Sequence, residues 1–430
     1  MLFAIIIFVV CILGCTWVGY PLFLALVTTR PTPRTLARGD ACPPENGDAR
    51  GDACPPENGD ARGDACPPEN GDARGDACPP VSILIAAHNE ETVIAERLRN
   101  LEGTDLPQGT EILIGCDGCS DETADLARKW TATLPALQVH DFPLRRGKPA
   151  VLKDLVERSS NEVLVFSDAN TMFAPDAVRK LLRPFRDPGV GGVCGRLVFV
   201  ESTGTETSEN LYWKLETFLK RREGRIDSCL GANGAIYAIR RELFWSDLPD
   251  STLIDDFVIG MKVREQGKRI VYAPEAVANE DLPETVSGEY ARRVRIGAGN
   301  YQALGICKRC LLPRYGAFAF AFFWHKAMRW FTPHLMIVLL AASLLLAATA
   351  GQGNGGKTAI GMTVLAVQAV FYGAGGIGRL IRGKCPPLLR PLQICDYFLS
   401  LQFALLAGFL RHVRRSQRVA WDRTERRPAE

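Results

Sequence analysis

Short apolar runs alternate with amphipathic stretches through the middle of the chain, whereas longer apolar runs lie at both ends. The short runs have the length of buried strands and lie at residues 81–87, 111–116, 163–168 and 190–199. The stretches that alternate with them are predicted helices, including residues 91–101, 150–157, 175–185 and 209–225. Alternating strand and helix signals predict βαβ units and a largely parallel sheet. The pattern therefore predicts an α/β domain between two apolar ends.

The apolar ends have the properties of membrane segments. Residues 2–27 lie in a stretch without charge and are long enough to cross a bilayer. A secretory signal would begin with a positive region, so this stretch is predicted to be an uncleaved anchor. Residues 333–350 and 358–377 are two further predicted spans, and the aromatic stretch 320–330 is predicted to lie at the lipid interface.

Basic residues predict the orientation of these segments. Arg30 and Arg34 follow the anchor, residues 379–390 hold four cations, and residues 411–427 hold seven arginines. The positive-inside rule places all three basic segments in the cytoplasm. Two full spans after the central domain return the chain there, and a third would export the arginine-rich tail. Residues 394–410 are therefore predicted to be re-entrant or to lie in the interface.

A repeated peptide separates the anchor from the central domain. Twelve residues beginning at Arg38 recur from Arg50 and Arg62, and a fourth copy begins at Arg74. Copies rich in Gly, Pro, Asp and Asn cannot bury a core, so we predict a disordered linker. The Arg-Gly-Asp triplets in the repeat also fit an adhesion motif, but a cytoplasmic spacer explains identical copies better.

Composition narrows the class of function. The net charge of +3 and the lack of a basic stripe in the soluble part argue against nucleic-acid binding, while 47% hydrophobic residues fit a partly membrane-embedded chain. Four of the fourteen cysteines belong to the repeat. The pairs Cys116/Cys119 and Cys307/Cys310 have zinc-ribbon spacing but lie in dissimilar contexts, so reduced thiols on the cytoplasmic side are the preferred interpretation.

Polar residues follow the predicted strands where ligands bind in open α/β sheets. Asp168 and Asn170 end one strand, Asp117 ends another, and His88 and Glu90 follow the first. Asx turns and helix caps also place such residues at strand ends, so each position alone fits a structural role. Their recurrence beyond successive strands favours a nucleotide and metal site.

Three later segments add candidate chemistry. Gly231, Asn233 and Gly234 suggest close approach of the backbone to a ligand, or a bend in the chain. Adjacent carboxylates at Asp255 and Asp256 begin a predicted helix, where they also favour the helix dipole. Residues 292–295, Arg-Arg-Val-Arg, form a basic cluster that fits either a phosphate clamp or a solvated helix face.

These motifs occur in an order that resembles the family-two inverting glycosyltransferases. The motifs are Ala-His-Asn-Glu from residue 87, Asp-Gly-Cys-Ser-Asp from 117, Asp-Ala-Asn from 168, Gly-Ala-Asn-Gly from 231 and Asp-Asp from 255. The similarity covers residues 81 to about 304. With its flanking apolar segments, the chain resembles the membrane-bound branch that includes poly-N-acetylglucosamine, hyaluronan and cellulose synthases.

The resemblance implies an α/β GT-A domain, a nucleotide-sugar transferase domain of Rossmann-like fold, with a donor site at the strand ends. His88 stands where the family stacks a ring on the base, with Glu90 beside it, and Asp117 matches the acid that bonds the base. Lys148 falls near the diphosphate, and Asp168 matches the first acid of the Asp-x-Asp motif that approaches ribose and metal.

The same resemblance implies the reacting groups. Asp256 matches the catalytic base, Asp255 takes the place of the Glu that usually precedes it, and Gly231, Asn233 and Gly234 resemble the acceptor-side segment. An acceptor hydroxyl is a poor nucleophile at neutral pH, so a positioned carboxylate that takes its proton accelerates transfer. A divalent cation, Mg²⁺ or Mn²⁺, and arginines would stabilise the departing diphosphate.

Two departures from the family pattern change the expectations. Asn170 replaces the second acid of Asp-x-Asp, so a metal held by Asp168 and Asn170 would meet less negative charge. Processive relatives carry Gln-x-x-Arg-Trp, where this chain has residues 292–296, Arg-Arg-Val-Arg-Ile. Arg292 and Arg295 retain cations for the diphosphate, but the Trp beneath an acceptor sugar is absent.

The sequence thus predicts a multi-pass protein of the cell membrane with a cytoplasmic catalytic domain. It would transfer a sugar from a nucleotide-sugar donor, expected to be a UDP-sugar, to a glycan or lipid-linked acceptor, in polysaccharide synthesis. The alternatives are a single-addition lipid glycosyltransferase and a non-catalytic nucleotide-sugar-binding subunit. The predicted regions are an anchor (1–29), a repeat linker (30–80), a GT-A domain (81–312), an interfacial helix (313–332), a membrane region (333–410) and a basic tail (411–430).

Overall fold

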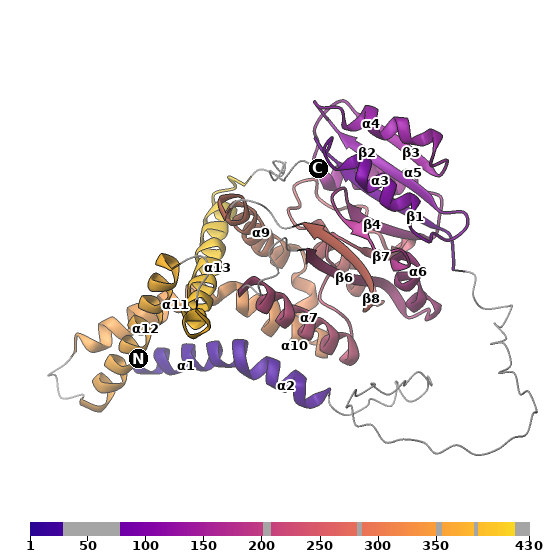
Figure 1. Cartoon of the computed structure of the whole chain (residues 1–430). Helices are drawn as coiled ribbons and strands as arrows, with labels where there is room; N and C mark the ends of the chain where they lie inside the picture. The colour runs from indigo at the N-terminus through magenta and orange to yellow at the C-terminus, as the bar shows by residue number, and fades with distance from the viewer. Residues whose placement is uncertain (29–77, 201–207, 282–285, 350–354, 382–385, 418–430) are drawn as a thin grey trace, which may run out of the picture.

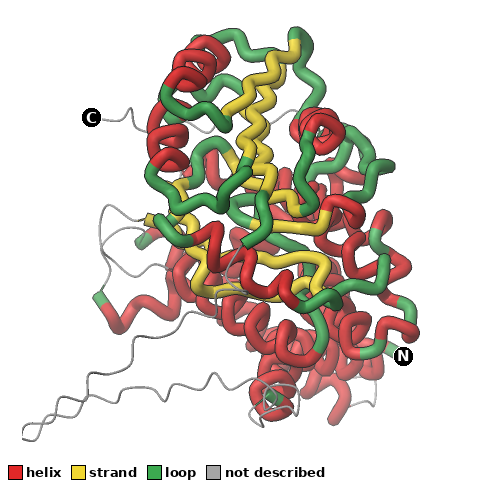
Figure 2. The backbone as a smooth tube through the Cα atoms, turned by 90° about the vertical axis from the view of Figure 1, so that its right-hand side faces the viewer, coloured by secondary structure: helices red, strands yellow, loops and turns green. Residues whose placement is uncertain are grey.

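A computed structural model describes residues 1–28, 78–200, 208–281, 286–349, 355–381 and 386–417. The predicted repeat linker up to residue 77 and the end of the basic tail lie outside these residues. The described chain forms an α/β part with one mixed sheet and a helical part beside it (Figure 1). Figure 2 shows the strands of the sheet on one side and most of the long helices gathered on the other.

The sheet has eight strands in the order β3-β2-β1-β4-β7-β6-β8-β5. Strands β1 to β4 are Val81–Ala87, Glu111–Asp117, Leu137–Phe142 and Val163–Asp168, and β5 to β8 are Met172–Phe173, Val190–Val200, Tyr237–Arg240 and Arg269–Asp281. Strands β3, β2, β1 and β4 run parallel, β7 pairs antiparallel with β4 and β6, and β8 runs parallel to β6. The carboxyl ends of β1, β2 and β4 therefore meet at one edge.

The central strands are buried on both faces because helices cover both sides. Strand β1 sends Ile83 and Ile85 into one core and Leu84 into the other, as the period of two requires. The first core contains α3 (Ile94–Glu102), α4 (Thr123–Lys129) and α6 (Ala177–Leu182), and the second contains α5 (Lys148–Arg158), α7 (Ser208–Ile226) and α8 (Asp255–Glu265). Because helices cover both faces of the sheet, the central strands are apolar at nearly every position.

Four helical segments among the described residues are long and apolar enough to cross a membrane. The first segment, Leu2–Val27, consists of α1 (Leu2–Gly14), a π-helical turn η1 (Cys15–Gly19) and α2 (Tyr20–Val27). The second, Ala317–Ala347, consists of α10 (Ala317–Ala321), a π-helical turn η7 (Phe322–Ala327) and α11 (Met328–Ala347). The third and fourth are the single helices α12 (Gly355–Leu380) and α13 (Arg390–Val413). Helix α1 packs on α11 through Ile6, Val9 and Leu339.

Helix α9 (Val286–Ile306) connects the two parts by packing against α13. A Cβ atom on Gly408 of α13 would lie 2.5 Å from the backbone nitrogen of Ala298, and one on Gly297 would lie 3.1 Å from the carbonyl oxygen of Ala404. The two backbones therefore approach as closely as only glycine allows. A one-atom side chain at Gly408 would force them apart.

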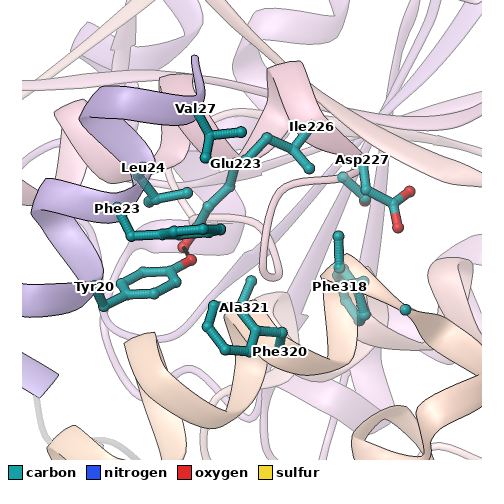
Figure 3. A pocket seen from close by; sticks show the side chains of 13 residues that line it. Tyr20, Phe23, Leu24, Val27, Glu223, Ile226, Asp227, Phe318, Phe320 and Ala321 are labelled. Carbon is teal, nitrogen blue, oxygen red and sulfur yellow. Dashed lines mark hydrogen bonds between the residues drawn. The ribbon is translucent and has the colours of Figure 1, made fainter. Parts of the chain in front are cut away.

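A cavity of about 380 Å³ lies where α2 meets α7 and α10 (Figure 3). Tyr20, Phe23, Leu24 and Val27 form one wall, and Phe318, Phe320 and Ala321 form the facing wall. Most of its surface is apolar, and none of the predicted site residues lines it. It lies between the N-terminal helix and the rest of the helical part.

The structure differs from the predicted elements at several places. The helix after β1 begins at Ile94, because residues 88–93 form turns. Strands β3, β5, β7 and β8 were not predicted. The predicted interfacial stretch and the first span after it form one helical segment, Ala317–Ala347, and the segment predicted to be re-entrant is part of the continuous helix α13.

Candidate active site

The strand-end residues Asp117 and Asp168 lie at the same edge of the sheet, as predicted. In the parallel register, Ala86 of β1 lies opposite Asp168 of β4, and Ala87 lies opposite Cys116 of β2. The turns after β1 and β2 are joined by hydrogen bonds, since the backbone N–H of Ser120 donates to Asn89 Oδ1 at 2.9 Å. The backbone N–H of Glu90 likewise donates to the Thr123 hydroxyl at 2.7 Å.

Asp117 is fully buried and holds the loop before α5. Its two carboxylate oxygens accept the backbone N–H groups of Arg146 and Gly147 at 2.7 and 2.8 Å. Its own carbonyl lies 2.6 Å from Nδ1 of His88, which fixes the imidazole ring. His88 and Asp117 are therefore directly connected, and the Asp117 carboxylate is used by backbone amides.

Lys148, at the start of α5, joins two of the predicted acids. Its Nζ lies 2.6 Å from Asp168 Oδ1 and 3.7 Å from Asp255 Oδ2. Burial lowers the pKa of Lys148, but the charges of Asp168, Asp255 and Asp256 outweigh burial and raise this pKa above its ordinary value. The lysine is therefore a permanent cation between strand β4 and helix α8.

Asp256, next to Asp255 at the start of α8, has a raised pKa. Burial raises its pKa to about 6, and the neighbouring Asp255 adds to the shift, while Lys148 opposes it. The Asp256 Oδ1 atom accepts the backbone N–H of Phe257 at 2.8 Å. A carboxylate with a pKa near the working pH suits a general base.

Asn170 contacts an acid that the sequence analysis did not single out. Its Nδ2 donates to Glu280 Oε1 at 2.9 Å, and Glu280 lies on β8 next to the short strand β5. Among the described residues, no group of three or more His, Cys, Asp and Glu side chains is arranged to hold a metal ion. Asp168, Asn170 and Glu280 carry side-chain oxygens of the kind that a hard cation binds, and in the structure Asn170 donates to Glu280 while Asp168 pairs with Lys148.

The predicted acceptor-side segment lies between these acids and the sheet. A Cβ atom on Gly234 would come 3.0 Å from Asp168 Oδ2, so the backbone passes directly beside that carboxylate. Gly231 has φ +71° and lies against Phe257, where a Cβ atom would come within 2.4 Å of the ring. Asn233 donates to the carbonyl of Gly195 at 2.9 Å and accepts the N–H of Ile236 at 3.2 Å, which is a structural use of its amide.

The basic cluster on α9 divides between two surroundings. Arg295 Nη1 donates to the carbonyl of Leu253 at 3.4 Å, close to the Asp255 carboxylate, and burial lowers its pKa. Arg292 lies 3.5 Å from Glu289, and Arg293 pairs with the same acid at 2.7 Å. The structure therefore brings Arg295 to the acids, whereas Arg292 and Arg293 share a carboxylate on their own helix.

Two buried residues near the acids gave no signal in the sequence. Tyr237 of β7 stacks on Phe166 at 4.7 Å between ring centroids, and burial together with the nearby Asp255 raises its pKa well above the ordinary value. Arg97 of α3 donates to Ser167, one residue before Asp168, at 3.0 Å, and burial lowers the pKa of Arg97 to about 9. Both lie inside otherwise apolar periodic patterns, so only the tertiary contacts reveal them.

Comparison with known proteins decides the family. A model described as "Glycosyltransferase like family 2" matches residues 79–299, which contain all the strands and the acids described above. The chain belongs to this family. It is therefore a glycosyltransferase, and the GT-A-like fold expected from the motifs is confirmed.

Two of the curated relatives that this family 2 glycosyltransferase matches are poly-beta-1,6-N-acetyl-D-glucosamine synthases. Poly-beta-1,6-N-acetyl-D-glucosamine synthase of Staphylococcus aureus (strain COL) is 27% identical over 233 residues, which cover 52% of this chain and 55% of the relative. The synthase of Staphylococcus epidermidis is 24% identical over 241 residues, with the same coverage of both chains. The match thus spans about half the length of these relatives.

A solved structure resembles the whole family 2 chain. The mannosyltransferase PcManGT from Pyrobaculum calidifontis, in complex with GDP-Man and Mn²⁺, has a TM-score of 0.67 and covers 97% of this chain and 100% of its own. The two sequences are 20% identical. This similarity shows that the fold, including the helical part, is shared.

Proposed function

We propose that this glycosyltransferase transfers a sugar from a nucleoside-diphosphate sugar to a hydroxyl of a glycan or lipid-linked acceptor at a membrane. The observation that carries the proposal is the pair Asp255 and Asp256 beside the Lys148–Asp168 ion pair. A raised pKa near 6 leaves Asp256 ionised at neutral pH, yet basic enough to accept a proton from an alcohol as it reacts.

The proposed reaction follows from the charges around this pair. The acceptor O–H loses its proton to the Asp256 carboxylate while its oxygen attacks the anomeric carbon. The bond from that carbon to the diphosphate breaks, and the electron pair leaves with the diphosphate. Attack opposite the leaving group inverts the anomeric centre. Lys148 and Arg295 are the cations near Asp168 and Asp255 that would stabilise the negative charge on the diphosphate.

A divalent cation fits the same edge of the sheet. Asp168, Asn170 and Glu280 would hold Mg²⁺ or Mn²⁺ together with oxygens of the donor diphosphate. When bound, the cation would neutralise charge on the leaving group. Glu280 supplies the carboxylate that Asn170 lacks, which supports metal dependence in spite of the altered Asp-x-Asp motif.

His88 and Glu90 are proposed to contact the nucleobase of the donor. His88 is fixed by the Asp117 carbonyl, so its ring is held in place for a nucleobase to stack on it, and Glu90 lies in the same turn. A UDP-sugar is the proposed donor, following the resemblance to N-acetylglucosamine polymer synthases. Gly231, Asn233 and Gly234 are proposed to lie on the acceptor side of the site.

The four apolar helical segments support a multi-pass protein of the cell membrane with the α/β part in the cytoplasm. Helix α13 begins at Arg390, holds Arg411 in its last turn and is followed by Arg414 and Arg415, which supports the prediction that α13 lies in the interface instead of spanning the bilayer. The basic residues on both sides of α13 would then remain on the cytoplasmic side. Polysaccharide synthesis at the cell surface is the proposed context.

A second candidate is the addition of a single sugar to a lipid-linked acceptor. Ile296 occupies the place where processive relatives carry Trp, so the platform beneath a growing chain is absent. Products of the purified protein separate the two candidates: a ladder of lengths indicates a polymerase, and one added sugar indicates single addition.

The test of the proposed function is release of nucleoside diphosphate by the full chain purified in detergent. A panel of nucleotide sugars is compared with Mg²⁺, Mn²⁺ or chelator, for the wild type, Asp256→Asn and the exposed control Asp247→Asn. Asp256→Asn should lower release by about 10²- to 10⁴-fold and keep nucleotide binding, while Asp247→Asn should have no effect. Full activity of Asp256→Asn, or no release with any donor and acceptor extract, would contradict the proposal.

A further inference from the structure

Cys116 and Cys119 lie at the end of β2 and in the turn that follows it, beside the proposed nucleobase site. Cys116 is fully buried and lies opposite Ala87 of β1 in the parallel register. Cys119 is partly exposed, and its thiol donates to the Ala87 carbonyl at 3.7 Å. Both cysteines are free thiols in the structure. They therefore lie next to Ala87, the residue that precedes His88, and the proposed transfer reaction uses neither of them.

The two thiols contact each other. The chain bends between them at Gly118, whose φ is +58°. A hydrogen bond from the Cys116 thiol to the Cys119 sulfur lowers the pKa of Cys119 and raises the pKa of Cys116. Burial opposes the shift at Cys119, while hydrogen bonds from the Asn89 N–H and the Thr123 hydroxyl add to it. The partly exposed thiol is therefore the more acidic of the two.

This arrangement has the properties of a peroxide-sensitive cysteine pair. The thiolate, and not the thiol, attacks a peroxide, so a partly exposed cysteine with a lowered pKa reacts first. A second thiol in contact with the first then completes a disulfide, and Cys116 is placed to do so. Cys-x-x-Cys spacing before a helix is typical of reversible redox sites, and α4 begins at Thr123. On the cytoplasmic side, such a disulfide would form transiently.

Cys307 and Cys310 have the same spacing but lack these properties. Both are fully buried, and burial raises the pKa of each thiol. The Cys310 thiol donates to the carbonyl of Met261 at 3.8 Å. Peroxide does not readily reach a buried, protonated thiol. This second pair is therefore an internal control for the effect of spacing alone.

The turn between Cys116 and Cys119 holds the loop before α5, residues 143–147. Both Asp117 carboxylate oxygens accept backbone N–H groups of this loop, and the Gly118 N–H donates to the Phe142 carbonyl at 2.9 Å. A Cβ atom on Gly118 would lie 2.5 Å from a backbone nitrogen of the same loop. Because turn and loop are in direct contact, a movement of the turn displaces the loop.

We propose that hydrogen peroxide oxidises Cys116 and Cys119 to a disulfide, which loosens the loop 143–147 and weakens binding of the sugar donor. The Cys119 thiolate attacks one peroxide oxygen and becomes a sulfenic acid, and the hydroxide released when the O–O bond breaks takes up a proton to form water. The Cys116 sulfur then attacks the sulfenic sulfur, and its proton leaves with the hydroxyl as a second water. Two thiols thus reduce one peroxide. The effect on the donor rests on the proposed function, whereas the disulfide does not.

Formation of the disulfide must move the turn. The sulfur atoms of a disulfide lie about 2.05 Å apart, which is closer than two thiols in hydrogen-bond contact. Cys116 is held in β2 by both neighbouring strands, so Cys119 makes most of the movement and gives up its hydrogen bond to the Ala87 carbonyl. Asp117 and Gly118 lie between the two cysteines and move with them. The contacts of these two residues with the loop 143–147 are therefore weakened.

The test compares the reduced and the peroxide-treated full chain in detergent. Mass spectrometry of the treated wild type should show loss of both thiol hydrogens from the peptide that holds Cys116 and Cys119, and dithiothreitol should restore them. Cys307 and Cys310 should stay reduced. Backbone hydrogen exchange in the loop 143–147 should become about tenfold faster on oxidation, because the Asp117 carboxylate no longer holds its amides. Neither measurement needs a nucleotide.

Matched variants assign the change to this pair. Cys119→Ser and Cys116→Ala should abolish both the disulfide and the faster exchange. Cys395→Ser, which removes another partly exposed thiol, should behave as wild type. Two variants at different positions keep the test informative if one of them fails to fold. Treated wild type without the disulfide, or with the disulfide but unchanged exchange, would overturn the proposal.

Binding of UDP measures the consequence for the donor site. Oxidised wild type should bind UDP about tenfold more weakly than reduced wild type, a loss of about 1.4 kcal/mol. Cys119→Ser should bind UDP equally before and after peroxide. Equal affinity of the two forms of the wild type would overturn the proposed effect on the donor. Reduced wild type that binds no nucleotide would instead contradict the proposed function, and hydrogen exchange would still decide whether the disulfide loosens the loop.

Discussion

The protein buries two clusters of charge whose balance differs. At the sheet edge, Asp168, Asp255 and Asp256 surround one lysine, so acids are in excess. Among the helices, Lys326 and Arg329 pair with Glu216, and His325 lies between Glu216 and Glu223, so each carboxylate has a basic partner. Both clusters combine the same kinds of side chain and both are largely removed from water.

The difference in balance gives the two sets of acids opposite properties. The pKa of Asp256 is raised to about 6 because burial and a second acid disfavour its charge, whereas that of Glu216 is held well below the ordinary range despite burial. The first cluster favours cations and protons, whereas the carboxylates of the second already have basic partners. Burial alone therefore does not determine the protonation of a buried carboxylate.

The largest effect is expected from removing the charge that holds the helical cluster together. Glu216→Gln leaves Lys326 and Arg329 buried without their carboxylate, which should lower the free energy of unfolding by about 3–5 kcal/mol. Denaturant unfolding in detergent measures it, with the exposed Glu102→Gln as control. A change below about 1 kcal/mol would mean that the cluster contributes little to stability.

The acid-rich cluster should respond in the opposite direction. The folded-state pKa of Asp256 lies above its ordinary value, so the folded protein binds this proton more tightly and loses stability as the pH rises from about 4 to about 6. Asp256→Asn removes the charge and should stabilise the fold at pH 7 by about 1–3 kcal/mol. Transfer by the wild type should rise with an apparent pKa near 6. A variant less stable than wild type at pH 7 would contradict the assigned electrostatics.

A smaller effect is expected from restoring the second acid of the Asp-x-Asp motif. Asn170→Asp adds a charged oxygen beside Asp168 and Glu280, which should lower the Mn²⁺ concentration for half-maximal activity by about tenfold. The exposed Gln108→Glu, at the opposite edge of the sheet, adds the same charge without effect on metal. If both variants behave alike, Asn170 does not face the cation.

The smallest effect is expected outside both clusters. Deletion of residues 38–73 removes three repeat copies from the predicted linker, and transfer activity should stay within about twofold of wild type because low-complexity segments of this kind bury no core. Activity of the purified deletion protein is the measurement. Loss of activity in a folded deletion protein would assign the repeat a role in catalysis or assembly.

The sequence predicted the parts of the fold that depend on apolar runs. Strands β1, β2, β4 and β6 agree with the structure because each is a nearly continuous apolar segment. Strand β3 contains the polar residues Gln138, His140 and Asp141, so its sequence does not resemble a buried strand. Strand β8 contains Pro274 and ends in Glu280 and Asp281, so its sequence does not resemble one either. Edge and bent strands depend on pairing partners that local patterns do not reveal.

The candidate site likewise contains residues that the sequence predicted and residues that it missed. Asp117, Asp168, Asp256 and Lys148 end strands or begin helices, so position along the chain together with the family resemblance was enough to single them out. Glu280 was missed because it contacts Asn170 across 110 positions, and Glu216 was missed because its helix reads as an ordinary amphipathic segment. Long-range pairing of charges is set by the tertiary fold and has no local signature.

The contact between Gly297 and Gly408 has a consequence for how such a sequence can diversify. Each glycine leaves room for the backbone of the other helix, and a side chain on Gly408 would collide with Ala298. Neither position can therefore accept a larger residue unless the helices separate. In homologues that keep this helix pair, we expect both positions to hold small residues or to change together. Such correlated substitution at the two positions would identify proteins with the same helix arrangement.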